Sequence, residues 1–309
     1  MRPTRSVLGQ FVLLALTWGS SFLFIKIGLE GLSPTQVVLG RMVTAAAALL
    51  IIAAVTGQRF PRSLVAWGHL AVVAMLLCLV PFLLFAWAEQ EVSSGLASIY
   101  NATTPVMTML VALAALPGER PSPGKLAGLA LGFAGVVLVL APWQGATGGS
   151  VTAQIACLAA TFSYGLAFVY LRRFISPLGL SALTVATTQV GIGAVVMVVA
   201  APFVAVTPVH LSWRVVLSIA ALGVLGTGLA YVWNTNVVAG WGATNASTVT
   251  YLTPVVGVGL GIVLLGETVT WNEPVGALIV VLGIAVSQGR LRHTSRPAVA
   301  DSNTVSVPR

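Results

Sequence analysis

Long apolar runs with almost no charge follow one another along the whole chain. Charged residues make up only 7% of the 309 residues, against about 25% in a soluble domain. A helix needs about 20 apolar residues to cross a hydrocarbon core about 30 Å thick. A water-soluble globule is therefore excluded, and the chain is predicted to lie in a membrane. Cutting at charges, prolines and glycine clusters leaves ten runs: 7–29, 35–56, 66–88, 93–115, 124–141, 151–172, 180–201, 213–234, 243–265 and 274–289.

The ten runs predict helices rather than the strands of a barrel. Residues 45–54 and 255–265 are apolar on every face, whereas barrel strands alternate apolar and polar residues. The first run is longer than the hydrophobic segment of a cleavable signal peptide, so we expect it to remain as a transmembrane helix. Cys78 and Cys157 lie inside apolar runs without metal-ligand partners, which predicts two small core side chains.

The net charge of +8 is distributed very unevenly over the loops. With ten spans both termini lie on one side, and by the positive-inside rule that side is cytoplasmic. The excess of bases is thus a topology signal rather than a surface for nucleic acid. The bases on that side are Arg2, Arg5, Arg59, Arg62, Arg120, Lys125, Arg172, Arg173, Arg290, Arg292, Arg296 and Arg309; the opposite loops hold Arg214, Glu30, Glu89, Glu91, Glu267 and Glu273.

The second half of the chain repeats the first. Trp18-Gly19 aligns with Tyr164-Gly165, Thr104-Pro105 with Thr253-Pro254, and Gly128 and Gly135 with Gly276 and Gly283. Five helices per copy is an odd number, so the second copy crosses the membrane in the opposite direction, as in many secondary transporters. The expected organisation is a five-helix repeat at 7–141, an inverted repeat at 151–289 and a disordered cytoplasmic tail at 290–309.

Short motifs stand at corresponding places in both repeats. They are Leu16-Thr17-Trp18-Gly19-Ser20-Ser21-Phe22, Ser33-Pro34 with Arg41, Pro105 before Gly118-Glu119, Ser163-Tyr164-Gly165, Gln189, Tyr251-Leu252-Thr253-Pro254, and Gly266-Glu267 with Gly276. Together these motifs resemble those of the EamA-type transporters, within the drug/metabolite transporter superfamily. The resemblance covers about Gly9 to Ser287. It implies a ten-helix carrier, without cofactor or metal, that exports amino acids or other small metabolites across the bacterial inner membrane as a monomer or homodimer.

Aromatic and polar residues at mid-span indicate a central site. Trp18 and Tyr164 lie near the centres of their runs, where lipid offers no hydrogen-bond partner, so both are expected to face the interior. Pro105 and Pro254 interrupt corresponding runs, the best pointer to a transporter's binding site, although the polar residues could simply satisfy a kink. The predicted cavity residues are Trp18, Ser21, Tyr100, Asn101, Thr104, Tyr164, Thr250, Tyr251 and Thr253, with Pro105, Pro254 and Pro81 as helix breaks.

A second group of residues has two interpretations each. Arg41 either extends to the outer interface or binds a substrate carboxylate, and Gln189 is its approximate counterpart in the second repeat. Lys26 is expected to pair with Glu30, four residues away on the same helix face. The residues Trp87, Glu89, Trp233 and Asn234 end two spans, either as gate residues or as an interfacial belt.

Acidic residues are missing from the middle third of every predicted span. This favours a neutral cavity lined by aromatic and amide groups, with facilitated export or exchange and weak proton coupling. An enzyme is not expected, because the sequence has no metal motif and no histidine beside a buried serine. Aromatic or neutral amino acids are the expected substrates. A lipid-headgroup flippase, a small-solute channel and a purely structural membrane protein are the alternatives.

Overall fold

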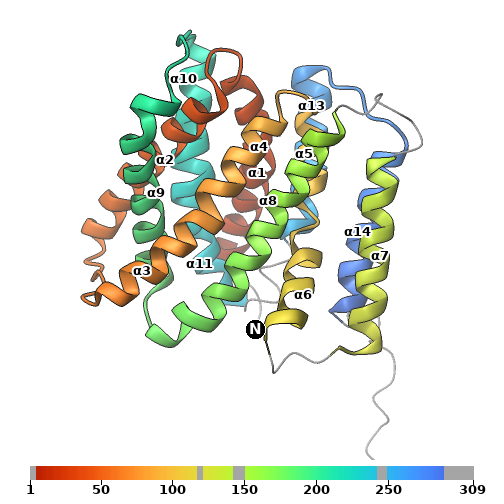
Figure 1. The fold of residues 1–309 in the computed structure, drawn as a ribbon, viewed down its shortest axis with the longest axis horizontal. Helices are drawn as coiled ribbons and strands as arrows, with labels where there is room; N and C mark the ends of the chain where they lie inside the picture. Colours follow the sequence, from red (N-terminus) through yellow and green to blue (C-terminus); the bar gives the residue numbers. More distant parts are fainter. Residues whose placement is uncertain (1–4, 117–120, 142–149, 242–248, 289–309) are drawn as a thin grey trace, which may run out of the picture.

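The computed structural model describes residues 5–116, 121–141, 150–241 and 249–288 (Figure 1). Within these ranges all regular structure is helical, in agreement with the predicted fold class. The predicted tail at 290–309 and the Gly118-Glu119 motif lie outside the described residues.

The helices of the first half correspond to five of the predicted runs, although α1, α2, α3 and α7 each begin one or two residues earlier. The third run is one continuous segment with a π-helical centre, and the fourth is broken into two helices. Their bounds are α1 (Arg5–Gly28), α2 (Pro34–Val55), α3 (Leu64–Val73), the π segment η1 (Ala74–Leu79), α4 (Val80–Ala88), α5 (Ser94–Asn101), α6 (Thr104–Ala115) and α7 (Pro123–Leu140).

The helices of the second half follow the other five runs. The eighth run again has a π-helical centre and continues to Trp241, past the predicted end at residue 234. The bounds are α8 (Val151–Tyr170), the π segment η3 (Leu171–Ile175), the 3₁₀ turn η4 (Ser176–Leu178), α9 (Ala182–Val204), α10 (Trp213–Ala220), the π segment η5 (Ala221–Leu229), α11 (Ala230–Trp241), α13 (Val249–Leu265) and α14 (Asn272–Ser287).

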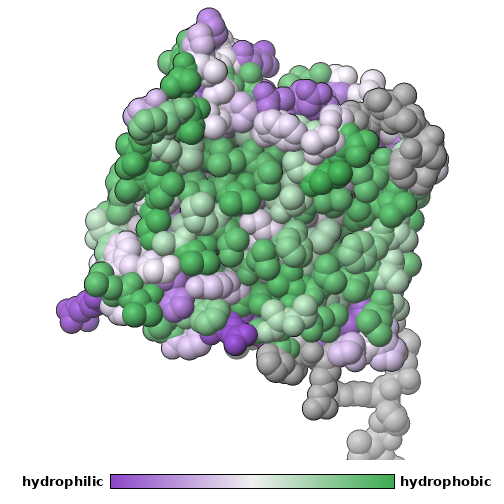
Figure 2. Space-filling model, viewed as in Figure 1, coloured by the Kyte–Doolittle hydropathy of each residue, from purple (hydrophilic) through white to green (hydrophobic). Residues whose placement is uncertain are grey.

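Eight helical segments of the described chain are long and apolar enough to cross a membrane, and α13 and α14 are shorter apolar helices. Figure 2 shows an apolar band across the visible face of the molecule, with polar side chains above and below it. Serines mark the helix starts, because a serine side chain accepts the hydrogen bond of a free backbone N–H. Such caps are Ser33, Ser93, Ser122, Ser181 and Ser212.

The predicted helix breaks have different outcomes. Helix α5 ends at Asn101 and α6 begins at Thr104, so Pro105 occupies the first turn of a new helix. Pro81 lies in the first turn of α4, directly after η1. Pro254, by contrast, lies inside α13, which continues through it. The expectation of matching breaks at Pro105 and Pro254 is therefore wrong for the described residues.

The two ends of the bundle differ in charge. The connections after α1, α4 and α13 carry Glu30, Glu89, Glu91 and Glu267, and we name this end the acidic face. The opposite end, the basic face, carries Arg59, Arg62, Lys125, Arg172 and Arg173. In Figure 1 the acidic face is at the top and the basic face at the bottom.

Helices α7 and α14 lie side by side at one edge of the molecule (Figure 1). A Cβ atom on Gly135 would lie 2.7 Å from the carbonyl oxygen of Gly276, and one on Gly283 would lie 2.7 Å from that of Gly128. The backbones therefore touch, because glycine leaves no side chain between them. The early position of each helix meets the late position of the other, so the pair is antiparallel and its contact is reciprocal.

Candidate functional site

A cavity of about 620 Å³ lies among helices from both halves of the chain. In the first half of the chain α1, α2, η1, α4, α5, α6 and α7 contribute to its lining, and in the second half α8, η5, α11, α13 and α14 do so. Most lining side chains are apolar, aromatic or uncharged polar groups. This volume lies within the range of about 300–1,000 Å³ that is typical of small-molecule sites.

Many of the predicted site residues line this cavity. They come from separate spans, so only the folded bundle brings them together. They are Trp18, Ser21, Arg41, Asn101, Thr104, Pro105, Tyr164, Asn234, Thr250 and Thr253.

Other predicted residues lie outside the lining. The Tyr100 hydroxyl is buried and donates to Gln154 Oε1 at 2.6 Å, and the Tyr251 hydroxyl donates to Gln288 Oε1 at 3.1 Å. Pro81, Pro254 and Gln189 are buried elsewhere, and Trp233 packs against an apolar cluster of α1 and α11. Trp87 is 42% exposed, which is the environment expected of an interfacial belt residue.

Arg41 is a buried residue of the cavity lining. It is only 7% exposed, its Nε donates to Thr227 Oγ1 at 3.0 Å, and its guanidinium lies 3.5 Å from the centroid of the Phe82 ring. Extension of Arg41 to the outer interface is therefore ruled out in this structure. No described carboxylate pairs with it, and Lys125 is the other charged residue of the described lining.

The cavity extends toward one membrane face and ends before the other. Toward the basic face its lining reaches Lys125, Ser287 and the exposed Gln288. Toward the acidic face its lining ends at Phe22, Ile25 and Phe85, and the rings of Phe22 and Phe85 are in T-shaped contact at 5.4 Å. We name this pair the aromatic plug. The structure thus represents a state in which the cavity is closed toward the acidic face.

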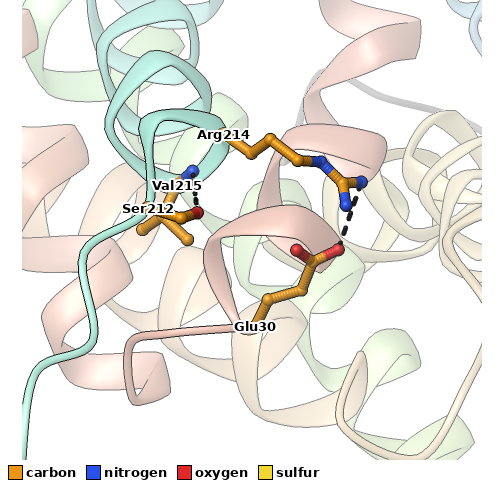
Figure 3. A network of polar contacts seen from close by, with 4 residues as sticks. All are labelled: Glu30, Ser212, Arg214 and Val215. Carbon is orange, nitrogen blue, oxygen red and sulfur yellow. Dashed lines mark hydrogen bonds and ion pairs between the residues drawn. The ribbon is translucent and has the colours of Figure 1, made fainter.

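Polar contacts between the two halves seal the acidic face beyond the plug. Glu30 forms an ion pair with Arg214 at 3.3 Å, beside the Ser212 cap of α10 (Figure 3). Glu267 accepts from the backbone N–H and hydroxyl of Ser94 and from the N–H of Gly95, at 2.7–3.0 Å.

Lys26 makes a further polar contact at the acidic face, within the first half of the chain. Its Nζ donates to the backbone oxygens of Glu89 and Val92, in the turn between α4 and α5. The predicted Lys26–Glu30 pair is therefore wrong. Lys26 instead binds the free carbonyl groups of a turn, and Glu30 finds its partner in the other half of the chain.

Two copies of one domain account for the repeated architecture. A sequence model described as the EamA-like transporter family matches residues 6–141 and again residues 151–288. The chain belongs to the EamA-like transporter family. It is accordingly a membrane transporter and not an enzyme.

Full-length relatives of this EamA transporter carry transporter names. The "Uncharacterized inner membrane transporter YedA" of Escherichia coli K12 is 27% identical over 97% of this chain and 96% of its own. The "Probable terminal-alkyne amino-acid exporter" of Streptantibioticus cattleyicolor is 28% identical over 93% and 96%. The "Probable amino-acid metabolite efflux pump" of Salmonella typhimurium is 24% identical over 92% and 96%.

A solved structure described as "Crystal structure of protein" resembles the EamA transporter in fold. The two share 19% sequence identity and a TM-score of 0.65, with 94% of this chain and 99% of the other covered. At this identity the likeness concerns the fold alone.

Several lining residues of the EamA transporter were missed by sequence reasoning. Phe82 and Phe85 stand three residues apart on α4, but a phenylalanine in an apolar run gives no sign that it faces a cavity. Thr227 and Tyr231 gave a usable signal, because a hydroxyl in the middle of an apolar run needs a partner. They lie four residues apart in the eighth run and so share a face across the π-to-α junction.

Proposed function

We propose that this EamA transporter is a secondary carrier of the bacterial inner membrane that exports amino acids with aromatic or other neutral side chains. Its cavity loads from the cytoplasm and releases substrate at the opposite face by alternating access. The two halves that rock against each other are the repeats predicted at 7–141 and 151–289.

The observation that carries this proposal is the position of Arg41. Its Nε is held by Thr227 and its flat face lies on Phe82. Both contacts leave the terminal nitrogens of the guanidinium free to bind a carboxylate in a bidentate fashion. Because Arg41 is only 7% exposed, water would screen such a pair less, and the pair would hold the substrate far more strongly than a surface pair does.

The remaining lining supports a compact, partly aromatic substrate. Trp18, Tyr164 and Phe85 present aromatic surfaces to the cavity, while Asn101 and Thr250 offer neutral polar groups that could bind an amino group. A phosphorylated sugar would bring more negative charge than the one central guanidinium can balance. Neutral amino acids carry one carboxylate and fit this arrangement.

Two features support the direction and topology of the proposed carrier. The basic face corresponds to the cytoplasm under the positive-inside rule, with both termini on that side, and the cavity reaches this face. The reciprocal contact of α7 with α14 supports an inverted repeat, because a two-fold axis in the membrane plane generates such a contact.

Counterflow in proteoliposomes tests the proposal. Vesicles preloaded with an unlabelled amino acid should take up the radiolabelled form saturably, with phenylalanine, tryptophan or alanine more effective than glutamate or lysine. Uptake that neither saturates nor responds to preloading would indicate a channel. Movement of a fluorescent phospholipid without amino-acid counterflow would indicate a flippase.

Replacement of Trp18 by alanine is expected to lower the affinity for aromatic substrates about tenfold, the equivalent of about 1.4 kcal/mol. The physical reason is the loss of one aromatic wall of the cavity. Trp87→Ala is the matched control, because Trp87 faces outward. The affinity of this variant for aromatic substrates should stay within about twofold of that of the parent protein. Concentration dependence of counterflow provides the measurement, and equal losses in both variants would contradict the placement of Trp18.

A further inference from the structure

Glu89 is a completely buried acid at the closed end of the cavity. It caps the C-terminus of α4, is 0% exposed, and neither carboxylate oxygen has a hydrogen-bond partner. A buried ionised carboxylate without hydrogen bonds is strongly disfavoured, and such a group takes up a proton instead. The proposed alternating-access export does not use this residue.

The charged groups near Glu89 make their hydrogen bonds to atoms other than its carboxylate oxygens. Lys26 of α1 donates to the backbone oxygens of Glu89 and Val92 rather than to the carboxylate. Arg41 of α2 donates to Thr227, and Glu267 accepts three hydrogen bonds from Ser94 and Gly95.

Burial has the largest effect on the pKa of the Glu89 carboxyl group. Glu89 directly follows the membrane-spanning segment Leu64–Ala88, and burial raises its pKa well above the ordinary value. The negative charge of Glu267 raises the pKa further, whereas Lys26 and Arg41 lower it. Among the described residues, the thiol of Cys157 on α8 also lies close enough to interact with Glu89. A neutral carboxyl group is the consistent description of the closed state.

Glu89 also lies where the protein must open to release the proposed substrate toward the acidic face. The aromatic plug separates it from the cavity: Phe85 precedes Glu89 by one helical turn, and Phe22 precedes Lys26 by one turn. Separation of the plug toward the acidic face would admit water to both Lys26 and Glu89. A hydrated carboxylate beside an ammonium group ionises readily.

We propose that Glu89 is a proton-binding site that holds a proton while the acidic face is closed and releases it when that face opens. The inference rests on the proposed alternating access. The proton controls the gate and does not drive transport, because the cavity and Glu89 lie on opposite sides of the plug.

The direction of the pH effect follows from linkage. The closed state binds the proton more tightly, so its advantage is fully present below the ordinary glutamate pKa and is lost as pH rises through the raised value. Between these limits each unit of pH changes the closed-to-open ratio by up to about tenfold. Mild acid therefore favours the closed acidic face, and alkaline conditions favour its opening.

Two measurements on the full chain in nanodiscs test this inference without a transport substrate. Infrared difference spectroscopy reports the carboxylic-acid C=O band of a protonated glutamate. Thiol labelling of Leu96→Cys reports opening, because Leu96 is buried in the same apolar cluster as the plug. Labelling is expressed relative to Gln90→Cys, at an exposed position of the neighbouring turn, which corrects for the pH dependence of the reagent.

At neutral pH the protein with the original sequence should show the protonated-acid band. The control Glu91→Gln removes an exposed acid of the same turn and should keep the band, whereas Glu89→Gln should lose it. Relative labelling at position 96 should rise at least about tenfold from about pH 5 to about pH 8. That rise should disappear in Glu89→Gln and persist in Glu89→Asp. An ionised Glu89 in the closed protein, or an unchanged pH response in Glu89→Gln, would overturn the inference, whatever the amino-acid counterflow assay shows.

Discussion

Arg41→Ala is expected to reduce transport of carboxylate substrates at least about a hundredfold, the equivalent of about 2.7 kcal/mol. The guanidinium is buried, held by Thr227 and stacked on Phe82, so a bound carboxylate would meet a fixed cation with little competing water. Removal of one partner from such a desolvated pair costs about 2–5 kcal/mol. Arg41→Lys keeps the charge but loses the stack and the fork of donors, and we expect an intermediate loss.

The matched control for this prediction is Arg62→Ala, at an exposed base of the basic face. Its counterflow should stay within about twofold of the parent, because exposed charges contribute little. The corresponding amino-acid amides serve as a chemical control, since they lack the carboxylate and should bind the parent and Arg41→Ala equally weakly. Undiminished carboxylate affinity in a folded Arg41→Ala protein would exclude Arg41 as the substrate contact.

Gly135→Ala is expected to destabilise the transporter by about 3 kcal/mol, near the upper end of the usual cost of overpacking. The added methyl group would lie 2.7 Å from the Gly276 carbonyl oxygen and 2.8 Å from the Val280 backbone nitrogen. These are backbone atoms of a helix and cannot rotate away as a side chain can. Helices α7 and α14 would have to separate. The effect should appear as a lower midpoint of thermal unfolding in detergent, measured by the loss of the monodisperse peak in size-exclusion chromatography after heating.

Gly124→Ala is the control within the same helix. Its nearest neighbour would be the Val286 carbonyl oxygen at 3.6 Å, which is an ordinary contact distance. The midpoint of thermal unfolding should therefore hardly change. Similar midpoints for the Gly135 and Gly124 variants would show that the α7–α14 contact can relax at little cost.

The arrangement of helices was largely predictable because lipid makes strict demands on each apolar run. A run without backbone partners in lipid must satisfy its own hydrogen bonds, so its length and its serine or proline boundary define a helix. The π segments η1 and η5 could not be foreseen in this way. Their residues are as apolar as those of the adjoining α-helices, and the difference lies in hydrogen-bond register.

Residues of the candidate site were predictable where a polar or amphipathic side chain stands in the middle of an apolar run, at a depth where lipid offers it no hydrogen-bond partner. Trp18, Asn101 and Thr253 are conspicuous in the middle of apolar runs, and all three line the cavity. Tyr100 was conspicuous for the same reason, yet its hydroxyl is satisfied by Gln154 on another helix. A single sequence cannot distinguish a partner on a neighbouring helix from a cavity.

The burial of Glu89 was out of reach for a related reason. At the end of an apolar run an acid is indistinguishable from an ordinary loop residue. Its burial depends on how α1 and the turn after α4 pack, which is information from residues more than 60 positions apart.

The reciprocal contact between α7 and α14 has the form of a subunit interface in a two-fold homodimer. In such a dimer of one five-helix unit, every central side chain would occur twice. Joining the two units in one chain removes that constraint. The predicted counterpart of Arg41 is Gln189, and the described lining of the cavity holds one guanidinium rather than two. The fused chain can therefore present an asymmetric site, which gives an asymmetric solute a single preferred orientation.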